Sequence, residues 1–284
     1  YIPLGAWIWR PPSAEVCAGV EATRLTPQSY PDALSIPYEV RYVPEEKKVL
    51  ATFKMAGNTV LDFWDDPSAN RLVVIDVSDP ARPALGDLPL PGPTLPEHTD
   101  YNPARREVVL NRVGYDVNTL DFIPLTDFPT LSLRHRRDLD YAPQGVVVFP
   151  DHAQIGVFSV DLNFEVVDPI TGQPSEQQRI PYGGPTVMVT NLSRAHGDDE
   201  VAVSTFGQMV KMLNLTTGEV RQGRVPFGGG DIVHVPEMKR IFQTNMVTRG
   251  LNVLDTRTMR LERAVSLPYQ PRAITADHDR DLLM

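Results

Sequence analysis

The chain has 284 residues, of which 42% are hydrophobic and 22% are charged, a composition that is typical of folded globular proteins and argues against extended disorder. Its 27 lysines and arginines are outnumbered by 36 aspartates and glutamates, and the net charge of −9 has the wrong sign for a protein that neutralises nucleic-acid phosphates. The single cysteine, Cys17, excludes an internal disulfide. We therefore predict no nucleic-acid partner, and we expect the one basic run, RHRRD at residues 134–138, to be a solvated loop.

Residues 1–34 form the first segment and show no regular period. The opening apolar run, YIPLGAWIW, has nine residues and ends before Arg10. It is too short to cross a bilayer and lacks the basic start of a signal peptide. We predict an irregular segment or linker here and no membrane span within this chain. An upstream anchor stays open, because Tyr1 is not an initiator methionine.

A repeated hairpin pattern follows and continues to the last residue. Each copy has an apolar strand, a turn of Pro, Asp and basic or polar residues, and a second apolar strand. The copies are YVPEEKKVLAT (42–52), YNPARREVVLN (101–111), VFPDHAQIGVF (148–158), TVMVTNLSRAHGDDEVAVST (186–205), HVPEMKRIFQT (234–244) and TADHDRDLLM (275–284).

A second hairpin alternates with the first, and its turn opens with Asp or Asn. These side chains favour tight turns because they bond to nearby backbone amides. The turn residues are Asp76, Asp168, Asn214 and Asp255, separated by 92 residues (two periods of 46), 46 and 41. The unit is therefore two hairpins, or four short strands, a period that is typical of propeller blades.

We predict an all-β fold, a β-propeller of four-stranded antiparallel blades, over residues 35–284. The expected units are 35–93, 94–142, 143–184, 185–229, 230–270 and a partial unit at 271–284. About five and a half blades are then present, and we interpret the chain as a fragment of a seven- or eight-bladed ring. Closure within these residues, with strands supplied from residues 6–10 and 20–25, is the alternative.

The start of the innermost strand is the first candidate site, because in a propeller these residues border the central channel. Successive units place Glu39, His98, Gly145, Thr186, Asp231 and Arg272 there. We single out Glu39, His98, Thr186, Asp231 and Arg272 as candidate ligand-binding residues. The alternative is that these groups pair with each other or with water.

The longest insertion, residues 54–71, falls between the second and third strands of the first unit. Long loops in compact domains are often functional. Its candidate residues are Asp62, Trp64, Asp65 and Asp66. The spacing of a calcium loop is absent, the histidines form no repeated ring, and haem, nucleophile-elbow, phosphate-loop and zinc-protease motifs are also absent. We therefore predict no metal and no cofactor.

The VLD-x-x-T turn, the PYGGP and PYQP passages between units and the P-x-x-K hairpins resemble the YVTN-type β-propeller repeat. This resemblance, to a superfamily with quinoprotein-dehydrogenase-like and lactonase-like members, implies a periplasmic, extracellular or membrane-tethered protein. We expect a non-catalytic binding or scaffold module with a protein or polysaccharide ligand, on the face that carries the crossovers between units and the loops between second and third strands. The alternative is a lactonase-like or quinoprotein-like enzyme that uses the polar residues at the channel mouth.

Overall fold

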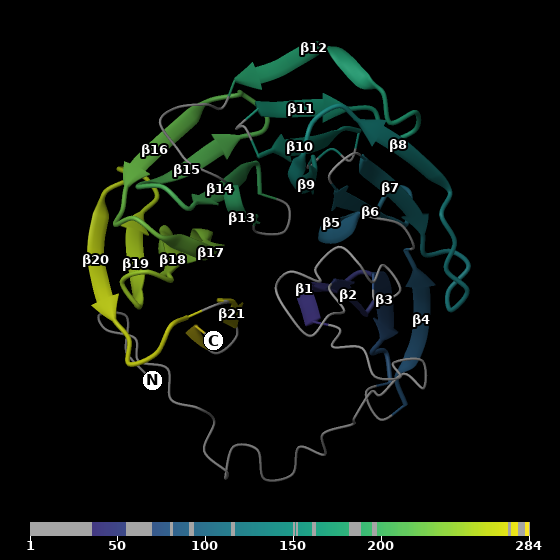
Figure 1. Ribbon diagram of the computed structural model, residues 1–284, viewed down its shortest axis with the longest axis horizontal. Helices are drawn as coiled ribbons and strands as arrows, with labels where there is room; N and C mark the ends of the chain where they lie inside the picture. The colour runs from purple at the N-terminus through teal and green to yellow at the C-terminus, as the bar shows by residue number, and fades with distance from the viewer. Residues whose placement is uncertain are drawn as a thin grey trace. The chain divides into compact units, whose positions relative to one another are not determined.

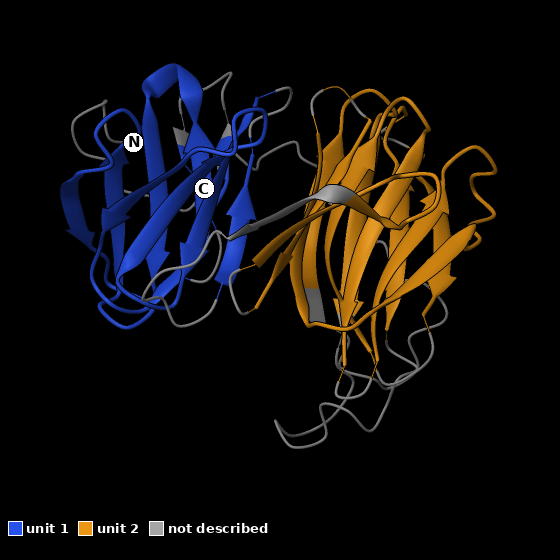
Figure 2. Ribbon diagram, turned by 90° about the horizontal axis from the view of Figure 1, so that it is seen from above, with its two compact units in different colours: residues 1–25, 185–284 blue, residues 26–184 orange. Residues whose placement is uncertain are grey.

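The computed structural model describes residues 36–54, 70–79, 82–90, 94–114, 117–149, 151, 153–160, 163–181, 189–194, 198–271, 274–277 and 282–283. The predicted segment 1–34 lies outside this part of the chain. The described residues form two compact units, shown in different colours in Figure 2. Unit 2 spans residues 26–184, and unit 1 includes residues 185–284.

Unit 2 contains three four-stranded antiparallel sheets, each built from four consecutive strands (Figure 1). The first has β1 (Ile36–Val43), β2 (Lys48–Lys54), β3 (Arg71–Asp76) and β4 (Ala84–Pro89). The second has β5 (Leu95–Asn102), β6 (Glu107–Val113), β7 (Asn118–Pro124) and β8 (His135–Leu139). The third has β9 (Pro143–Val148), β10 (Ile155–Ser159), β11 (Asn163–Val167) and β12 (Pro174–Pro181).

Unit 1 contains two further sheets of the same kind and a short hairpin. The fourth sheet has β13 (Val189–Ser193), β14 (Glu200–Thr205), β15 (Met209–Asn214) and β16 (Val220–Arg224). The fifth has β17 (Gly229–Val235), β18 (Arg240–Asn245), β19 (Gly250–Asp255) and β20 (Leu261–Ser266), with a 3-10 turn at Pro236–Met238. Strands β21 (Ala276–Asp277) and β22 (Leu282–Leu283) pair with each other. Five sheets in sequence confirm the predicted all-β fold of four-stranded antiparallel units and are consistent with propeller blades.

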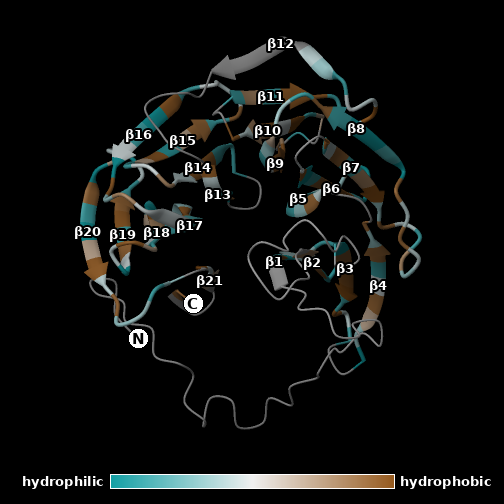
Figure 3. Cartoon of the chain, viewed as in Figure 1, coloured by the Kyte–Doolittle hydropathy of each residue, from teal (hydrophilic) through white to brown (hydrophobic). Residues whose placement is uncertain are grey.

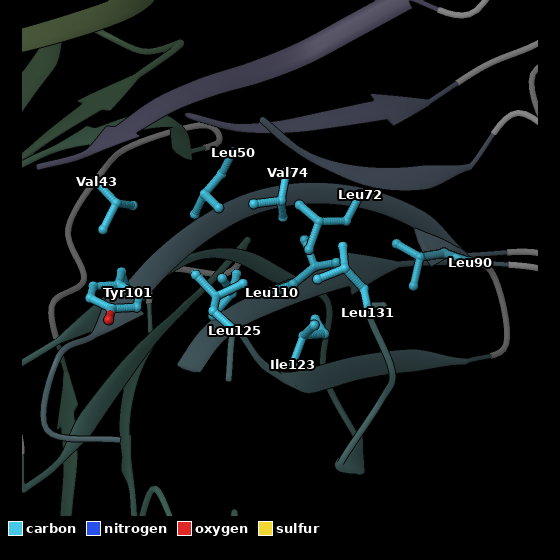
Figure 4. Close-up of a cluster of buried hydrophobic side chains, with 11 residues drawn as sticks. Val43, Leu50, Leu72, Val74, Leu90, Tyr101, Leu110, Ile123, Leu125 and Leu131 are labelled. Atoms are coloured by element: carbon cyan, nitrogen blue, oxygen red, sulfur yellow. The ribbon is translucent and has the colours of Figure 1, made fainter. Parts of the chain in front are cut away.

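Apolar side chains on both faces of the sheets build the core. In β6, Val108 and Leu110 pack with Leu50 and Leu72 of the first sheet (Figure 4), whereas Val109 points to the other face and packs with residues of the third sheet. This alternation is the strand period of two. A similar cluster joins the fourth and fifth sheets.

We predicted that the basic run at residues 134–138 is a solvated loop, and this prediction is wrong. Most of the run belongs to the edge strand β8. Arg134 Nη2 donates to Glu107 Oε2 at 2.9 Å, and Arg136 donates to both carboxylate oxygens of the buried Asp121 at 2.7 Å. Strand β8 is accordingly hydrophilic in Figure 3, whereas β15 is mainly hydrophobic. The edge strand accommodates this charge because Asp121 of the adjacent β7 and Glu107 of β6 supply carboxylates.

The Asp and Asn turns form as predicted and close the hairpins between third and fourth strands. Asp168 Oδ1 accepts hydrogen bonds from the amides of Ile170 and Thr171 at 2.8 and 2.7 Å. Asn214 Oδ1 accepts two equivalent bonds from Thr216 and Thr217, and Asp76 and Asp255 also bind nearby turn amides. The repeat therefore depends on local turn chemistry.

We expect Asp168→Ala to lower the free energy of unfolding of unit 2 by about 1 kcal/mol, since it removes the acceptor of two turn amides. The matched control is Asp168→Asn, because Asn214 makes the same bonds naturally, and it should cost less than half as much. Urea denaturation, monitored by far-ultraviolet circular dichroism, measures both changes. Equal losses for Ala and Asn would contradict the role given to the side-chain oxygen.

Candidate functional site

In each of the five described four-stranded sheets, the first strand in chain order, which we call the inner strand, carries a β-bulge near its start. The register shifts lie between Pro37 and Glu39, between Pro96 and Thr99, at Gln144, between Val189 and Asn191, and between Gly229 and Ile232. A bulge bends the strand and changes the direction of its side chains.

Three of the predicted site residues lie at these bulges: Glu39, His98 and Asp231. Glu39 and His98 belong to unit 2, where the structure brings them together, and Asp231 belongs to unit 1. The fourth inner strand is described from Val189 onward. The other predicted site residues lie outside the described part of the chain; they are Thr186, Arg272, Asp62, Trp64, Asp65 and Asp66.

Both carboxylate oxygens of Glu39 have partners. Oε2 accepts bonds from the backbone amide and the hydroxyl of Thr99, in the next sheet, at 2.6 and 2.7 Å. Oε1 lies 3.5 Å from Nη2 of Arg41 and 3.5 Å from Nδ1 of His98. Burial alone would raise the pKa of Glu39, but the Arg41 guanidinium and the bonds from His98 and Thr99 together outweigh it and lower the pKa to about 2. Glu39 is therefore ionised at neutral pH and is a poor proton donor.

Asp100 continues the chain of polar contacts toward the third sheet. Its Oδ1 accepts from Arg41 Nη1 at 2.8 Å, and its Oδ2 accepts from the amide of Val148 in β9 at 2.6 Å. Gln144 of β9 also donates through Nε2 to Glu97 Oε2 of β5, at 3.1 Å. The polar residues at the inner strands of unit 2 thus link three successive sheets.

His98 is the one imidazole in this group, and it is 4% exposed. Its Nε2 is buried and has no hydrogen-bond partner among the residues that the structure describes. The ring of Tyr38 lies against it, with centroids 5.4 Å apart. An imidazole beside a carboxylate has the composition of an acid–base pair, but it is enclosed by protein here.

Asp231 has an equivalent role in unit 1. Its Oδ2 accepts from the amide of Ile274, beyond the fifth sheet, at 2.8 Å. Its Oδ1 accepts from the amide of Ile232 at 2.8 Å and from the side-chain amide of Asn191 in the fourth sheet. The carboxylate of Asp231 therefore accepts three hydrogen bonds. They connect the fifth sheet to the fourth sheet and to the segment before β21.

His234, in unit 1, is another buried histidine. Its Nδ1 lies 3.5 Å from Asp198 Oδ2, and burial lowers its pKa. Its backbone amide donates to Ser193 Oγ at 2.9 Å. Within the described ranges, no group of three or more histidine, cysteine or acidic residues is arranged to hold a metal ion.

The loops at one end of the fourth and fifth sheets carry exposed apolar side chains that the sequence analysis did not single out. Phe227, Val247 and Tyr269 are 42%, 57% and 42% exposed; we call them the loop platform. They lie on the loops 225–228, 246–249 and 267–270, which connect strands at this end of the sheets. The PFGGG and PYQP passages lie in two of these loops. The exposure of their apolar side chains follows no sequence period, so the sequence pattern could not predict it.

Backbone and side-chain hydrogen bonds join the loops that carry the platform. The amide of Gly228 donates to the carbonyl of Phe206, and the amide of Met246 donates to the carbonyl of Gly228, at 3.1 and 2.9 Å. Gln270 Nε2 donates to the carbonyl of Met246 at 2.9 Å. The rings of Phe206 and Phe227 meet edge to face at 4.9 Å between centroids. The three exposed side chains are therefore held on one connected surface.

A scan against models of known protein families and a search of curated protein sequences found no match. No helix in the described residues is long and apolar enough to span a membrane.

We expect Glu39→Gln to lower the free energy of unfolding of unit 2 by on the order of 2–3 kcal/mol at pH 7, because the lost charge is stabilised in the folded state. The folded-state pKa of about 2 lies below the ordinary value of 4.5. The stabilisation is thus present above about pH 4.5 and is lost as the pH falls toward 2. Urea denaturation at several pH values measures it. A difference between wild type and variant that stays constant down to pH 3 would contradict the ionised role.

We expect Asp231→Ala to speed hydrogen exchange at the amide of Ile274, because its acceptor is removed. The amide of Ile232 should lose protection for the same reason. Mass spectrometry of peptides that cover residues 229–235 and 270–277 measures both. Asp168→Ala in unit 2 is the control and should leave these peptides unchanged; unchanged exchange in Asp231→Ala itself would refute the fastening role.

Proposed function

We propose that this chain is a non-catalytic β-propeller module that binds a protein or polysaccharide ligand. The binding surface is the end of the sheets that carries the crossovers between sheets and the loops between second and third strands. The observation that carries this proposal is the contrast between two sets of residues. The polar groups at the inner strands are engaged with neighbouring sheets, whereas the loop platform is exposed.

The state of the polar residues argues for binding rather than catalysis. A general acid or base works best with a pKa near the working pH. The pKa of Glu39 is lowered to about 2, because its cationic and hydrogen-bonding neighbours outweigh the rise that burial alone would cause. The carboxylate of Asp231 already accepts three hydrogen bonds. Both groups act as acceptors for fixed protein donors, so a reaction would first have to displace those donors.

The class of module rests on the resemblance of the hairpins to the YVTN-type repeat. On that resemblance we place the protein outside the cytoplasm, as an exported or envelope-tethered protein. Fold resemblance specifies the scaffold more strongly than its ligand. The ligand surface is therefore argued from the exposed residues and not from the family.

One observation favours the alternative of a lactonase-like or quinoprotein-like enzyme. His98 Nδ1 lies 3.5 Å from Glu39 Oε1, and Nε2 of the same ring is buried with no partner in the described part of the chain. A carboxylate that orients an imidazole is a common element of acid–base catalysis. The enzyme alternative therefore requires His98 for activity, and the binding proposal does not.

The two functions are separated by assaying the full chain for turnover and for binding. We expect no hydrolysis of a panel of lactones and no quinone-dependent oxidation of alcohols, together with saturable binding to phage-displayed peptides or to an array of polysaccharides. The variant His98→Asn should keep the binding. Turnover that disappears in His98→Asn would overturn the proposal in favour of the enzyme, and absence of binding to both probes would refute it directly.

A further inference from the structure

The loop platform of unit 1 is held in shape without a ligand. Asn245, fully buried at the end of β18, donates through Nδ2 to the carbonyls of Pro226 and Phe227 at 3.0 and 3.1 Å. Its Oδ1 accepts from the amides of Val247 and Thr248 at 3.1 and 2.8 Å. One amide side chain therefore fixes two loops, which reduces the conformational entropy that binding would cost.

Gly228 lets these two loops approach closely. Its φ of 103° lies in a region that other residues rarely adopt. A Cβ atom at this position would lie 2.4 Å from Cγ2 of Val247. The close approach of the two loops at Gly228 and Val247 is thus built into the backbone.

The four loops at this end of the fourth and fifth sheets contain no acidic residue, although the chain has a net charge of −9. None of the residues in loops 206–208, 225–228, 246–249 and 267–270 is Asp or Glu. Arg249 lies in one of these loops, and Arg224 ends β16 immediately before another; both are exposed. Neither has an ion pair within the described residues, whereas Arg221 and Arg240 of the same unit contact carboxylates. The platform therefore offers two cations to a ligand.

The composition of the platform suits a protein segment better than a polysaccharide. Val247, the most exposed of the three, offers an aliphatic surface and no hydrogen bond to a sugar hydroxyl. The Nε2 group of Gln270 is already bonded to the carbonyl of Met246. Aromatic residues and arginine are enriched at the centres of protein interfaces, where apolar anchors are buried.

We propose that the loop platform binds an acidic segment of a partner protein that carries a large apolar side chain. The apolar side chain packs on Phe227, Val247 and Tyr269, and carboxylates beside it pair with Arg224 and Arg249. The proposal rests on the proposed binding function and names its ligand class. Charge attraction of this kind also speeds association and weakens with salt.

The test selects random dodecapeptides, displayed on phage, against the immobilised full chain. We expect the enriched sequences to combine acidic residues with Trp, Phe or Leu. Synthetic fluorescent copies should then bind with a Kd that rises as sodium chloride is added, measured by fluorescence anisotropy. Val247→Ser, Tyr269→Ser and Arg249→Glu should each raise this Kd by about tenfold or more.

Two matched variants serve as controls. Ile170→Ser removes an apolar side chain that is 60% exposed in unit 2, and Arg260→Glu reverses an exposed charge at the other end of the fifth sheet. Both should leave the Kd unchanged. Thermal unfolding of every variant separates a loss of binding from a loss of folding.

The failures are distinguishable. Peptides that bind equally well to the platform variants, or enriched peptides without acidic residues, would overturn this inference and leave a binding module with a different surface. Binding to an array of polysaccharides alone would also overturn it while supporting the proposed function. Absence of binding to peptides and polysaccharides alike would refute both.

Discussion

Side chains near the inner-strand bulges hold neighbouring sheets together by binding the backbone of the next sheet. The hydroxyl of Thr52 accepts a hydrogen bond from the amide of Glu39 at 3.2 Å. The same hydroxyl donates to the carbonyl of Glu97 in the second sheet at 2.9 Å. Asn111 repeats this arrangement one sheet later, accepting the amide of His98 and donating to the carbonyl of Pro143. A bulge frees backbone groups, and buried free groups are costly. The bulges and their bridging side chains therefore require each other.

This constraint decides what chemistry the inner strands have available. Three carboxylates each accept a hydrogen bond from a backbone amide of the following sheet or segment: Glu39 from Thr99, Asp100 from Val148 and Asp231 from Ile274. A carboxylate that satisfies a buried amide cannot be moved to a substrate without leaving that amide unpaired. Glu39 and Asp231, which we predicted as ligand-binding residues, thus also connect neighbouring sheets or segments in the fold.

The fold was predictable because its signals are local, and the site was less so because its contacts are distant. Asp168 and Asn214 bind amides two and three residues away, so their turns follow from the sequence. The contact of Glu39 with Thr99 spans 60 residues and depends on a bulge that no pattern announces. The strand at 135–139 was missed because the carboxylate partner of Arg136 is Asp121, 15 residues away on the adjacent strand β7. The exposed fraction of Val247 has no period at all.

The two ends of a sheet are not equivalent in how freely their sequences can vary. At the end with Asp255, backbone amides of the turn donate hydrogen bonds to the carboxylate of Asp255. The amide of Thr256 donates to the carbonyl of Lys239 in the adjacent turn. At the other end, the loops of the fourth and fifth sheets are fixed by Asn245, one buried side chain that binds backbone atoms only. Because Asn245 binds backbone atoms, the side chains of Phe227 and Val247 can change without removing these bonds. A surface that is held firmly and yet free in sequence is where a repeat protein can acquire a specific ligand.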